Sequence, residues 1–215
     1  MAAPQAGIAR EIRALRELIA RAAADKVEPG DIVAINGGEM GLMLAEELAG
    51  FRDITVVTNA LEIMERLDGV AGVKVIMTSG EYYSKYRCLV GPSLGALFET
   101  LKASKAFLSV DGVSAQFGPS AADERLALAA RRFIEGSRQT FILADHSVVG
   151  VDAGNRIAPL RAVAEVITDG GTLPADRLAL AATGTLVTIS DSGEQGADIP
   201  PQTSETGLQR RTAAT

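Results

Sequence analysis

The segment Asp31-Ile32-Val33-Ala34-Ile35-Asn36-Gly37-Gly38 decides the fold class. Its apolar centre predicts a short buried strand, and the two glycines predict a tight turn. A helical pattern that carries Leu42, Leu44 and Leu48 follows the turn directly. A strand, a glycine turn and a helix in this order are typical of a parallel α/β sheet.

The same alternation continues along the chain. Strand patterns occur at residues 54–58, 73–78, 106–110, 140–144, 165–168 and 186–189, and helical patterns at 60–67 and 121–137. Strands this apolar are buried on both faces, and helices between them imply right-handed crossovers. We therefore expect an α/β fold, a Rossmann-like three-layer sandwich with a mainly parallel sheet.

The chain divides into three parts. Residues 1–26 carry an apolar stripe that predicts an N-terminal helix, formed by Ile8, Ile12, Leu15, Ile19 and Ala22. This helix packs on its own domain or serves as a linker, a coupling element or an oligomer seam. Residues 27–190 form the main domain, since the 215 residues are 47% hydrophobic. Residues 191–215 lose apolar periodicity, so we expect a disordered tail.

Composition excludes several classes of protein. The net charge of −6 makes this chain alone a poor nucleic-acid binder. Five basic residues within the first 26 are interpreted as a solvated helix face. The lone Cys88 and the single histidine leave no zinc constellation, so we expect no metal and no cofactor. Without a signal peptide or a membrane-spanning stretch, we expect a cytoplasmic protein that does not enter a membrane.

In an open parallel sheet, ligands bind beyond the carboxyl ends of the strands. The first candidate loop follows the strand at 31–36, where missing side chains allow close approach and helix N–H groups attract anions. A plain structural turn is the alternative, and Glu39 would repel a phosphate. The ligand-binding candidates in this loop are Asn36, Gly37, Gly38, Glu39 and Met40.

The second candidate is the segment 79–87, which holds all three tyrosines of the chain. Tyrosine offers flat contact area with a hydroxyl group, and lysine and arginine bind anions, so the segment suits a polar or acidic small molecule. A subunit contact would have the same composition. The candidates here are Glu81, Tyr83, Lys85 and Arg87.

Two further loops follow later strands. Asp111 and Gly112 come after one, and Asp145 and His146 after another, so both aspartates should point into the same crevice. His146 with Ser147 suggests a nucleophile, but consecutive residues seldom reach the geometry of a catalytic triad. Hydrogen bonding to a ligand or a structural role is the favoured interpretation.

Taken in order, these segments resemble the C-terminal sensor domain of the DeoR family. The similarity covers about residues 22–189. It rests on Gly37-Gly38, Ile54-Thr55-Val56-Val57-Thr58-Asn59, Ser79-Gly80-Glu81 with Val90-Gly91-Pro92, Lys105-Ala106-Phe107 leading to Asp111-Gly112-Val113-Ser114, Ala144-Asp145-His146-Ser147, Ile157-Ala158-Pro159-Leu160 and Val166-Ile167-Thr168-Asp169. Each motif alone is weak, whereas seven in order are specific.

The resemblance implies a fold akin to ribose-5-phosphate isomerase and CoA transferases. It also implies that the domain senses a metabolite, often a sugar phosphate, and changes how a linked helix-turn-helix domain holds its operator. That DNA-binding domain is absent from this chain, so DNA would be contacted only through it. The expected partners are therefore a small carbohydrate or sugar-phosphate effector and further copies of the chain in a homo-oligomer.

Two positions depart from the family pattern. The first loop carries Glu39-Met40-Gly41 where the family usually has threonines that hold phosphate, and Val148 stands where a lysine is common. Both changes remove phosphate-binding groups. We therefore hypothesise an effector that is less anionic than a sugar phosphate, or one held mainly by Lys85 and Arg87.

Two other classes of function remain as alternatives. An isomerase would need an acidic cluster beyond Asp111-Gly112 and a loop rich in lysine and glycine, and neither occurs. A CoA transferase would need a glutamate nucleophile, for which Glu39 or Glu81 lacks supporting residues. An oligomerisation module with a vestigial pocket is the third interpretation. The sequence favours a ligand sensor that is not an enzyme.

Overall fold

The computed structural model describes residues 3–190, with side chains from residue 11 onward. The centre of the fold is a seven-stranded parallel sheet. The strand order is β12-β11-β9-β6-β1-β2-β3, and every neighbouring pair is parallel. The predicted mainly parallel α/β fold is confirmed. The strands are β1 (Ile32–Ile35), β2 (Ile54–Thr58), β3 (Val73–Met77), β6 (Ala103–Ser109), β9 (Ser137–Leu143), β11 (Glu165–Asp169) and β12 (Leu186–Ser190).

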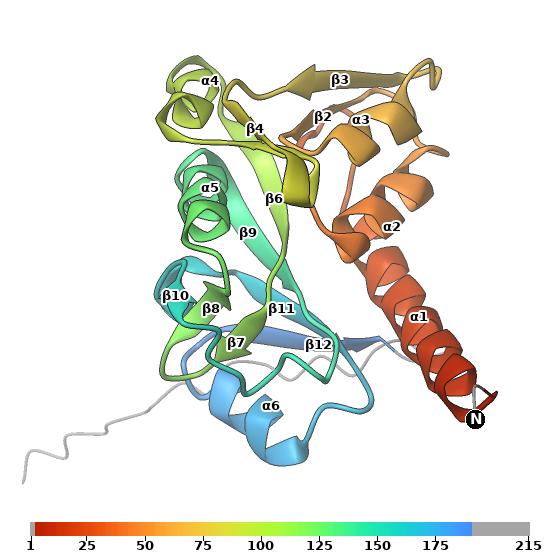
Figure 1. Cartoon of the computed structure of the whole chain (residues 1–215), viewed down its shortest axis with the longest axis vertical. Coiled ribbons are helices and arrows are strands. Elements are labelled where there is room, and N and C mark those ends of the chain that lie inside the picture. Colours follow the sequence, from red (N-terminus) through yellow and green to blue (C-terminus); the bar gives the residue numbers. More distant parts are fainter. Residues whose placement is uncertain (1–2, 191–215) are drawn as a thin grey trace, which may run out of the picture.

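Helices cover both faces of this sheet (Figure 1). One face carries α1 (Ala3–Ala24), α2 (Glu39–Leu48) and α3 (Leu61–Leu67), and the other carries α4 (Ala96–Thr100), α5 (Glu124–Glu135) and α6 (Pro174–Ala181). Side chains alternate along each strand, so Val33 and Ile35 of β1 pack toward α1–α3 while Ala34 packs toward α5. This alternation divides the core into two apolar layers.

The N-terminal helix packs on its own domain. Ile19 and Ala23 of α1 are fully buried, and the helix contacts α2 as well as β9, β11 and β12. Ile12 and Leu15 are partly buried, so the apolar stripe faces the protein over the described side chains. The predicted disordered tail at 191–215 lies outside the described residues.

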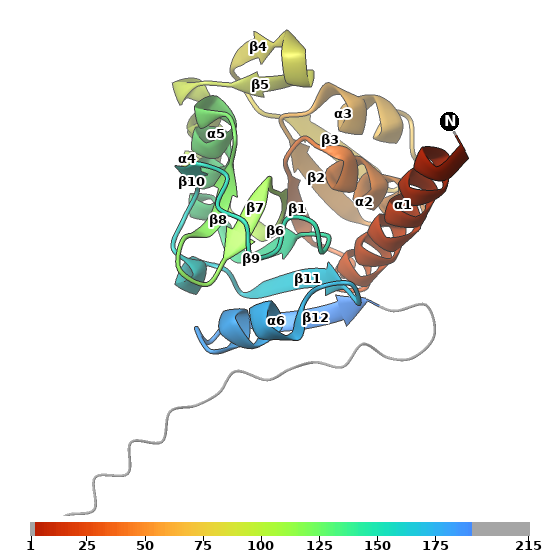
Figure 2. The same ribbon diagram turned by 60° about the horizontal axis from the view of Figure 1, so that its bottom comes forward.

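Smaller elements lie on the α5 side of the sheet. A hairpin of β4 (Glu81–Tyr83) and β5 (Cys88–Val90) lies next to α5 (Figure 2). A three-stranded antiparallel sheet in the order β10-β8-β7 is formed by β7 (Gly112–Ser114), β8 (Gly118–Ala121) and β10 (Asn155–Arg156). Short 3₁₀ turns complete the fold at Ser84–Tyr86, Pro92–Gly95 and Leu160–Ala162.

The direction of strand addition reverses between β1 and β6. From β1 the chain adds β2 and β3 on one side, and then returns to place β6, β9, β11 and β12 on the other. In such sheets the loops on either side of the reversal diverge and leave a crevice at the carboxyl ends of the strands. The fold therefore places a potential ligand site next to the loops that follow β1 and β6.

Candidate ligand-binding site

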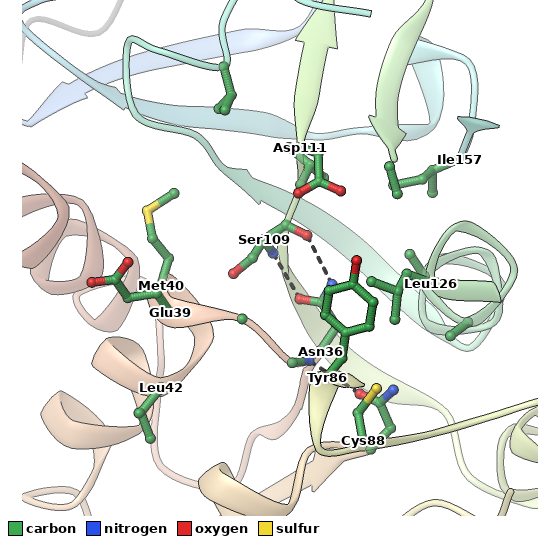
Figure 3. A pocket seen from close by; sticks show the side chains of 18 of the residues that line it. Asn36, Glu39, Met40, Leu42, Tyr86, Cys88, Ser109, Asp111, Leu126 and Ile157 are labelled. Atoms are coloured by element: carbon green, nitrogen blue, oxygen red, sulfur yellow. Dashed lines mark hydrogen bonds between the residues drawn. The ribbon is translucent and has the colours of Figure 1, made fainter. Parts of the chain in front are cut away.

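A cavity of about 490 Å³ lies at this reversal point (Figure 3). The loops after β1, β2, β6 and β9 contribute to it, and so do α1, α5 and the β4–β5 hairpin region. Of the residues that the sequence suggested, the cavity brings together Asn36, Gly37, Gly38, Glu39, Met40, Asp111 and Asp145.

Asn36 joins the two strands that flank the reversal. Its side-chain Nδ2 donates to the carbonyl oxygen of Ser109 at 2.9 Å, and its Oδ1 accepts the Ser109 N–H at 2.8 Å. The Ser109 hydroxyl in turn accepts the Gly41 N–H at 3.0 Å. These bonds, drawn in part in Figure 3, fix the end of β1, the end of β6 and the start of α2 relative to one another.

The glycines of the first loop are needed for this close packing. Gly38 has a φ of 129°, which side chains rarely adopt, and a Cβ there would lie 3.0 Å from the Ser109 Cβ. A Cβ on Gly41 would lie 2.4 Å from the Asn36 carbonyl oxygen. The first turn of α2 consequently opens on the cavity, and its leading N–H groups have no acceptor within the helix.

Arg16 of α1 reaches across the cavity to two carboxylates. Its Nε donates to Asp145 Oδ2 at 2.6 Å, and its Nη1 forms an ion pair with Glu39. The Asp145 side chain is only 2% exposed, and Arg16 is 26% exposed. Arg16 therefore connects the N-terminal helix with the loop after β9 and the start of α2.

The pKa of Asp145 reflects these contacts. Burial alone would raise the pKa of this carboxyl, but hydrogen bonds from Ser147 and Arg16 outweigh burial and hold the pKa below its ordinary value. Burial likewise opposes the charge of Arg16, yet Asp145 and Glu39 raise its pKa above the ordinary value. Both groups are charged at neutral pH.

The opposite wall of the cavity is apolar. Leu126, Ala129 and Ala130 of α5 line it together with Ile157, and Tyr86 also belongs to the lining (Figure 3). An apolar wall facing a few fixed polar groups is the usual composition of a small-molecule site.

The charged groups of the lining are mostly acidic. Four carboxylates line the cavity, those of Glu39, Glu62, Asp111 and Asp145, and Arg16 is the one cation among the described lining residues. Asp111 accepts the Ala122 N–H at 2.8 Å. The cavity thus offers acceptors for hydroxyl or amino groups and little positive charge for an anion.

The basic residues of the second predicted segment do not line the cavity. Arg87 forms ion pairs with Glu62 at 3.1 Å and Glu65 at 3.0 Å, and Lys85 is exposed beside the Tyr86 ring. The predicted role of Lys85 and Arg87 as the main holders of an effector therefore finds no support in this geometry.

Glu81 and Tyr83 also lie away from the cavity. Glu81 is exposed in β4. The Tyr83 hydroxyl donates to Asp123 at 2.7 Å, and the Arg125 guanidinium lies 3.5 Å above the Tyr83 ring. These contacts fasten the hairpin to the start of α5, and only Tyr86 of this segment reaches the lining.

Two further candidates are adjacent to the cavity without lining it. Gly112 is buried in β7, where a Cβ would lie 2.5 Å from the Val151 carbonyl oxygen. His146 Nδ1 lies 2.9 Å from Asp169, while the Ser147 hydroxyl donates to Asp145. The Ser147 hydroxyl is thus not bonded to the imidazole, and this loop lacks the arrangement of a nucleophile and its base.

Sequence reasoning missed Arg16, which it had interpreted as part of a solvated face. Arg16 lies 129 positions from Asp145 in sequence. A signal existed, because Arg16 follows Ile12 by four residues and precedes Ile19 by three, which places it on the buried face of α1. A charged residue within an apolar helix face indicates a buried partner.

Among the described residues, no group of three or more His, Cys, Asp or Glu side chains is arranged to hold a metal ion. No helix between residues 3 and 190 has the length and apolar character that a membrane span needs. The cavity and its position at the reversal of a parallel sheet define an α/β domain of the small-molecule-binding kind.

Comparison with known proteins places this domain in a family. Residues 13–170 match the DeoR C terminal sensor domain. The chain is 33% identical over 165 residues to the uncharacterized HTH-type transcriptional regulator YulB of Bacillus subtilis (strain 168), covering 77% of this chain and 64% of YulB. The chain therefore belongs to the DeoR sensor-domain family.

Other relatives are also regulators. The transcriptional repressor AccR of Agrobacterium fabrum (strain C58 / ATCC 33970) is 29% identical over 170 residues, covering 79% of this chain and 66% of AccR. This chain thus spans about two thirds of the length of these curated relatives.

Solved structures show more distant likenesses. The probable sor operon regulator from Shigella flexneri has a TM-score of 0.48 and 12% identity, covering 78% of this chain and 88% of that one. Ribose 5-phosphate isomerase from Plasmodium falciparum has a TM-score of 0.47 and 10% identity, covering 63% and 52%.

Proposed function

We propose that this chain is the effector-sensing domain of a bacterial transcription regulator, and that it is not an enzyme. A small metabolite would bind in the cavity at the β1–β6 reversal and alter DNA binding by a linked helix-turn-helix domain. The observation that carries the proposal is the contact of Arg16 with Asp145 and Glu39, because it joins the cavity to the N-terminal helix. The protein would act in the cytoplasm, in a homo-oligomer.

The effector is proposed to be a carbohydrate or a related polar metabolite. A volume of about 490 Å³ suits one molecule of this size. The acidic groups and Asn36 can accept hydrogen bonds from hydroxyl groups, and the α5 wall can contact the apolar face of a sugar ring. Among the relatives, the lactose phosphotransferase system repressor of Staphylococcus epidermidis is 28% identical over 160 residues.

The proposed switch depends on α1 as the coupling element. A ligand shifts an equilibrium only when it binds one arrangement of the protein better than another. An effector that contacts Glu39 or Asp145 would compete with Arg16 or tighten its contacts, and α1 would respond because Ile19 and Ala23 fix it to the same core. A coupling free energy of about 1–3 kcal/mol is typical of such links.

A thermal-shift screen tests the binding. The purified chain is heated with sugars, sugar acids, polyols and their phosphates. A ligand at a hundredfold excess over its Kd stabilises by about 2.7 kcal/mol, which raises Tm by about 5–10 °C for a domain of this size. The absence of any saturable shift across the panel would contradict the proposal.

A cavity-filling variant shows where the ligand binds. Ala129→Leu enlarges a side chain of the α5 wall and should abolish the ligand-induced shift. Ala175→Leu, the same change on the exposed surface of α6, serves as the control and should keep the shift. Hydrogen exchange over residues 11–24, measured with and without the stabilising ligand, then tests whether α1 responds.

A further inference from the structure

We propose that the cavity selects against anions, so that its effector is a polyhydroxylated molecule without a phosphate or carboxylate group. This inference rests on the proposed function, since it names the chemical class of the effector at the same site. It follows from the charges that line the cavity and from the contacts that those charges already make.

The one cation of the described lining is already engaged. Arg16 contacts both Asp145 and Glu39, and Asp145 is almost fully buried. A phosphate that bound Arg16 would have to displace one of these carboxylates or lie beside both of them. Like charges at such short range oppose binding, and the burial of Asp145 increases the opposition from that carboxylate.

The start of α2 is also occupied by negative charge. The N-terminus of a helix attracts anions through its free N–H groups and its dipole. In this chain the first residue of α2 is Glu39, whose carboxylate lies at that end and lines the cavity. Glu39 therefore places a negative charge at this helix end, and that charge weakens the attraction for a phosphate.

The remaining polar groups suit hydroxyl donors. Figure 3 shows the Asp111 carboxylate and the Tyr86 hydroxyl pointing into the cavity from different elements. A carboxylate only accepts hydrogen bonds, so it pairs with a sugar hydroxyl and repels a phosphate oxygen. Val148 lines the cavity as an apolar side chain, and the nearby Arg87 is held by Glu62 and Glu65.

Inorganic phosphate is the first probe, because it tests the charge of the cavity without knowledge of the effector. The whole chain is titrated with sodium phosphate, and a parallel titration with sodium chloride matches the ionic strength at each step. The wild type should show no saturable thermal shift larger than the one that sodium chloride produces. The double variant Glu39→Gln with Asp111→Asn should bind phosphate at least about tenfold more tightly than the wild type, which corresponds to about 1.4 kcal/mol.

A matched control distinguishes the effect of charges inside the cavity from the effect of the net charge of the protein. Glu46→Gln with Asp68→Asn removes the same two charges from exposed positions that do not line the cavity. This control should behave as the wild type. Saturable stabilisation of the wild type by phosphate would overturn the inference, and so would a gain in the Glu39 and Asp111 variant no larger than that of the control.

Paired ligands then separate this inference from the proposed function. Glucose is compared with glucose 6-phosphate, and myo-inositol with its monophosphate. Stronger stabilisation by the unphosphorylated member of a pair supports both proposals. Stronger stabilisation by the phosphorylated member overturns the charge inference and leaves a sensor. If no sugar or polyol binds while phosphate still binds only the neutralised variant, the charge inference stands and the sensor function fails.

Discussion

Replacing Arg16 by glutamine should destabilise the domain more than the loss of an ordinary surface charge. Glutamine keeps much of the length of the side chain but removes the charge that Asp145 and Glu39 contact. A hydrogen bond to a charged group contributes about 1.5–3 kcal/mol, and leaving a buried charge unpaired costs more. Asp145 keeps its bonds from Ser147, so a loss of about 2–3 kcal/mol is expected from these magnitudes.

The assay is thermal unfolding combined with a double-mutant cycle. A loss of this size lowers Tm by about 5–10 °C in a domain of this length. Arg21→Gln is the control. Arg21 of α1 pairs with Glu47 of α2 at 3.2 Å, as Arg16 pairs with Glu39 of α2, but Arg21 is 63% exposed. Exposed pairs contribute about 0–1 kcal/mol, so the control should lower Tm by less than about 4 °C.

The cycle adds Asp145→Asn and the double variant. Because Arg16 and Asp145 are in direct contact, their effects should be non-additive by about 1–3 kcal/mol. Additive effects within about 0.5 kcal/mol, or an Arg16→Gln loss no larger than that of Arg21→Gln, would refute the assignment of Arg16 as the link between α1 and the cavity.

Three further predictions follow from other contacts. Because the folded pKa of Asp145 is depressed, its contribution to stability is present above about pH 4 and is lost as pH falls through that pKa. Asp145→Asn should therefore reduce the fall in the free energy of unfolding at acid pH, measured by urea unfolding from pH 2 to 7. A profile parallel to the wild type would contradict this. Gly38→Ala should cost about 1–3 kcal/mol by denaturant unfolding, since it combines a φ of 129° with a contact on Ser109, and a neutral effect would show that the loop adapts. Tyr83→Phe should cost about 1 kcal/mol through its lost bond to Asp123 and should raise hydrogen exchange in residues 81–90, whereas unchanged exchange there would exclude that anchoring role.

The strands of the main sheet were predictable because their residues carry the signal themselves. Ile54–Thr58 is β-branched throughout and mostly apolar, and the predicted and observed bounds coincide. β6 begins at Ala103, three residues before the predicted start. The prediction began too late because Ser104 and Lys105 are polar and interrupt the apolar pattern. Lys105 is tolerated in a central strand because Asp31 pairs with it at 2.7 Å, a contact that no local pattern reveals.

The small elements were not predictable for a related reason. β7, β8 and β10 are short and contain Gly, Ser and Asn, and the pairing of β10 with β8 joins residues more than 30 positions apart. A strand with a turn-like composition cannot be recognised from its own residues when it is stabilised mainly by pairing with its partner strand.

The residues of the candidate site likewise fall into a predictable and an unpredictable group. The loop residues Asn36, Asp111 and Asp145 were found from topology alone, since the ends of parallel strands meet at one edge. Arg16 and the α5 wall depend on how helices dock on the sheet, and Tyr86 depends on the path of the hairpin. Those arrangements come from contacts distant in sequence.

The docking of α1 also has a consequence for the order in which the domain folds. α1 precedes β1 in the chain, yet it packs on β9, β11 and β12, which follow it by more than a hundred residues. During synthesis, the part of α1 that packs on β9, β11 and β12 therefore stays uncovered until those strands have been made, although α2 is available much earlier, and closing such long loops slows folding. A ribosome-bound chain that stops before β11 should leave part of α1 accessible to proteases, and Arg16 lacks its buried partner Asp145 until the residues after β9 have been made.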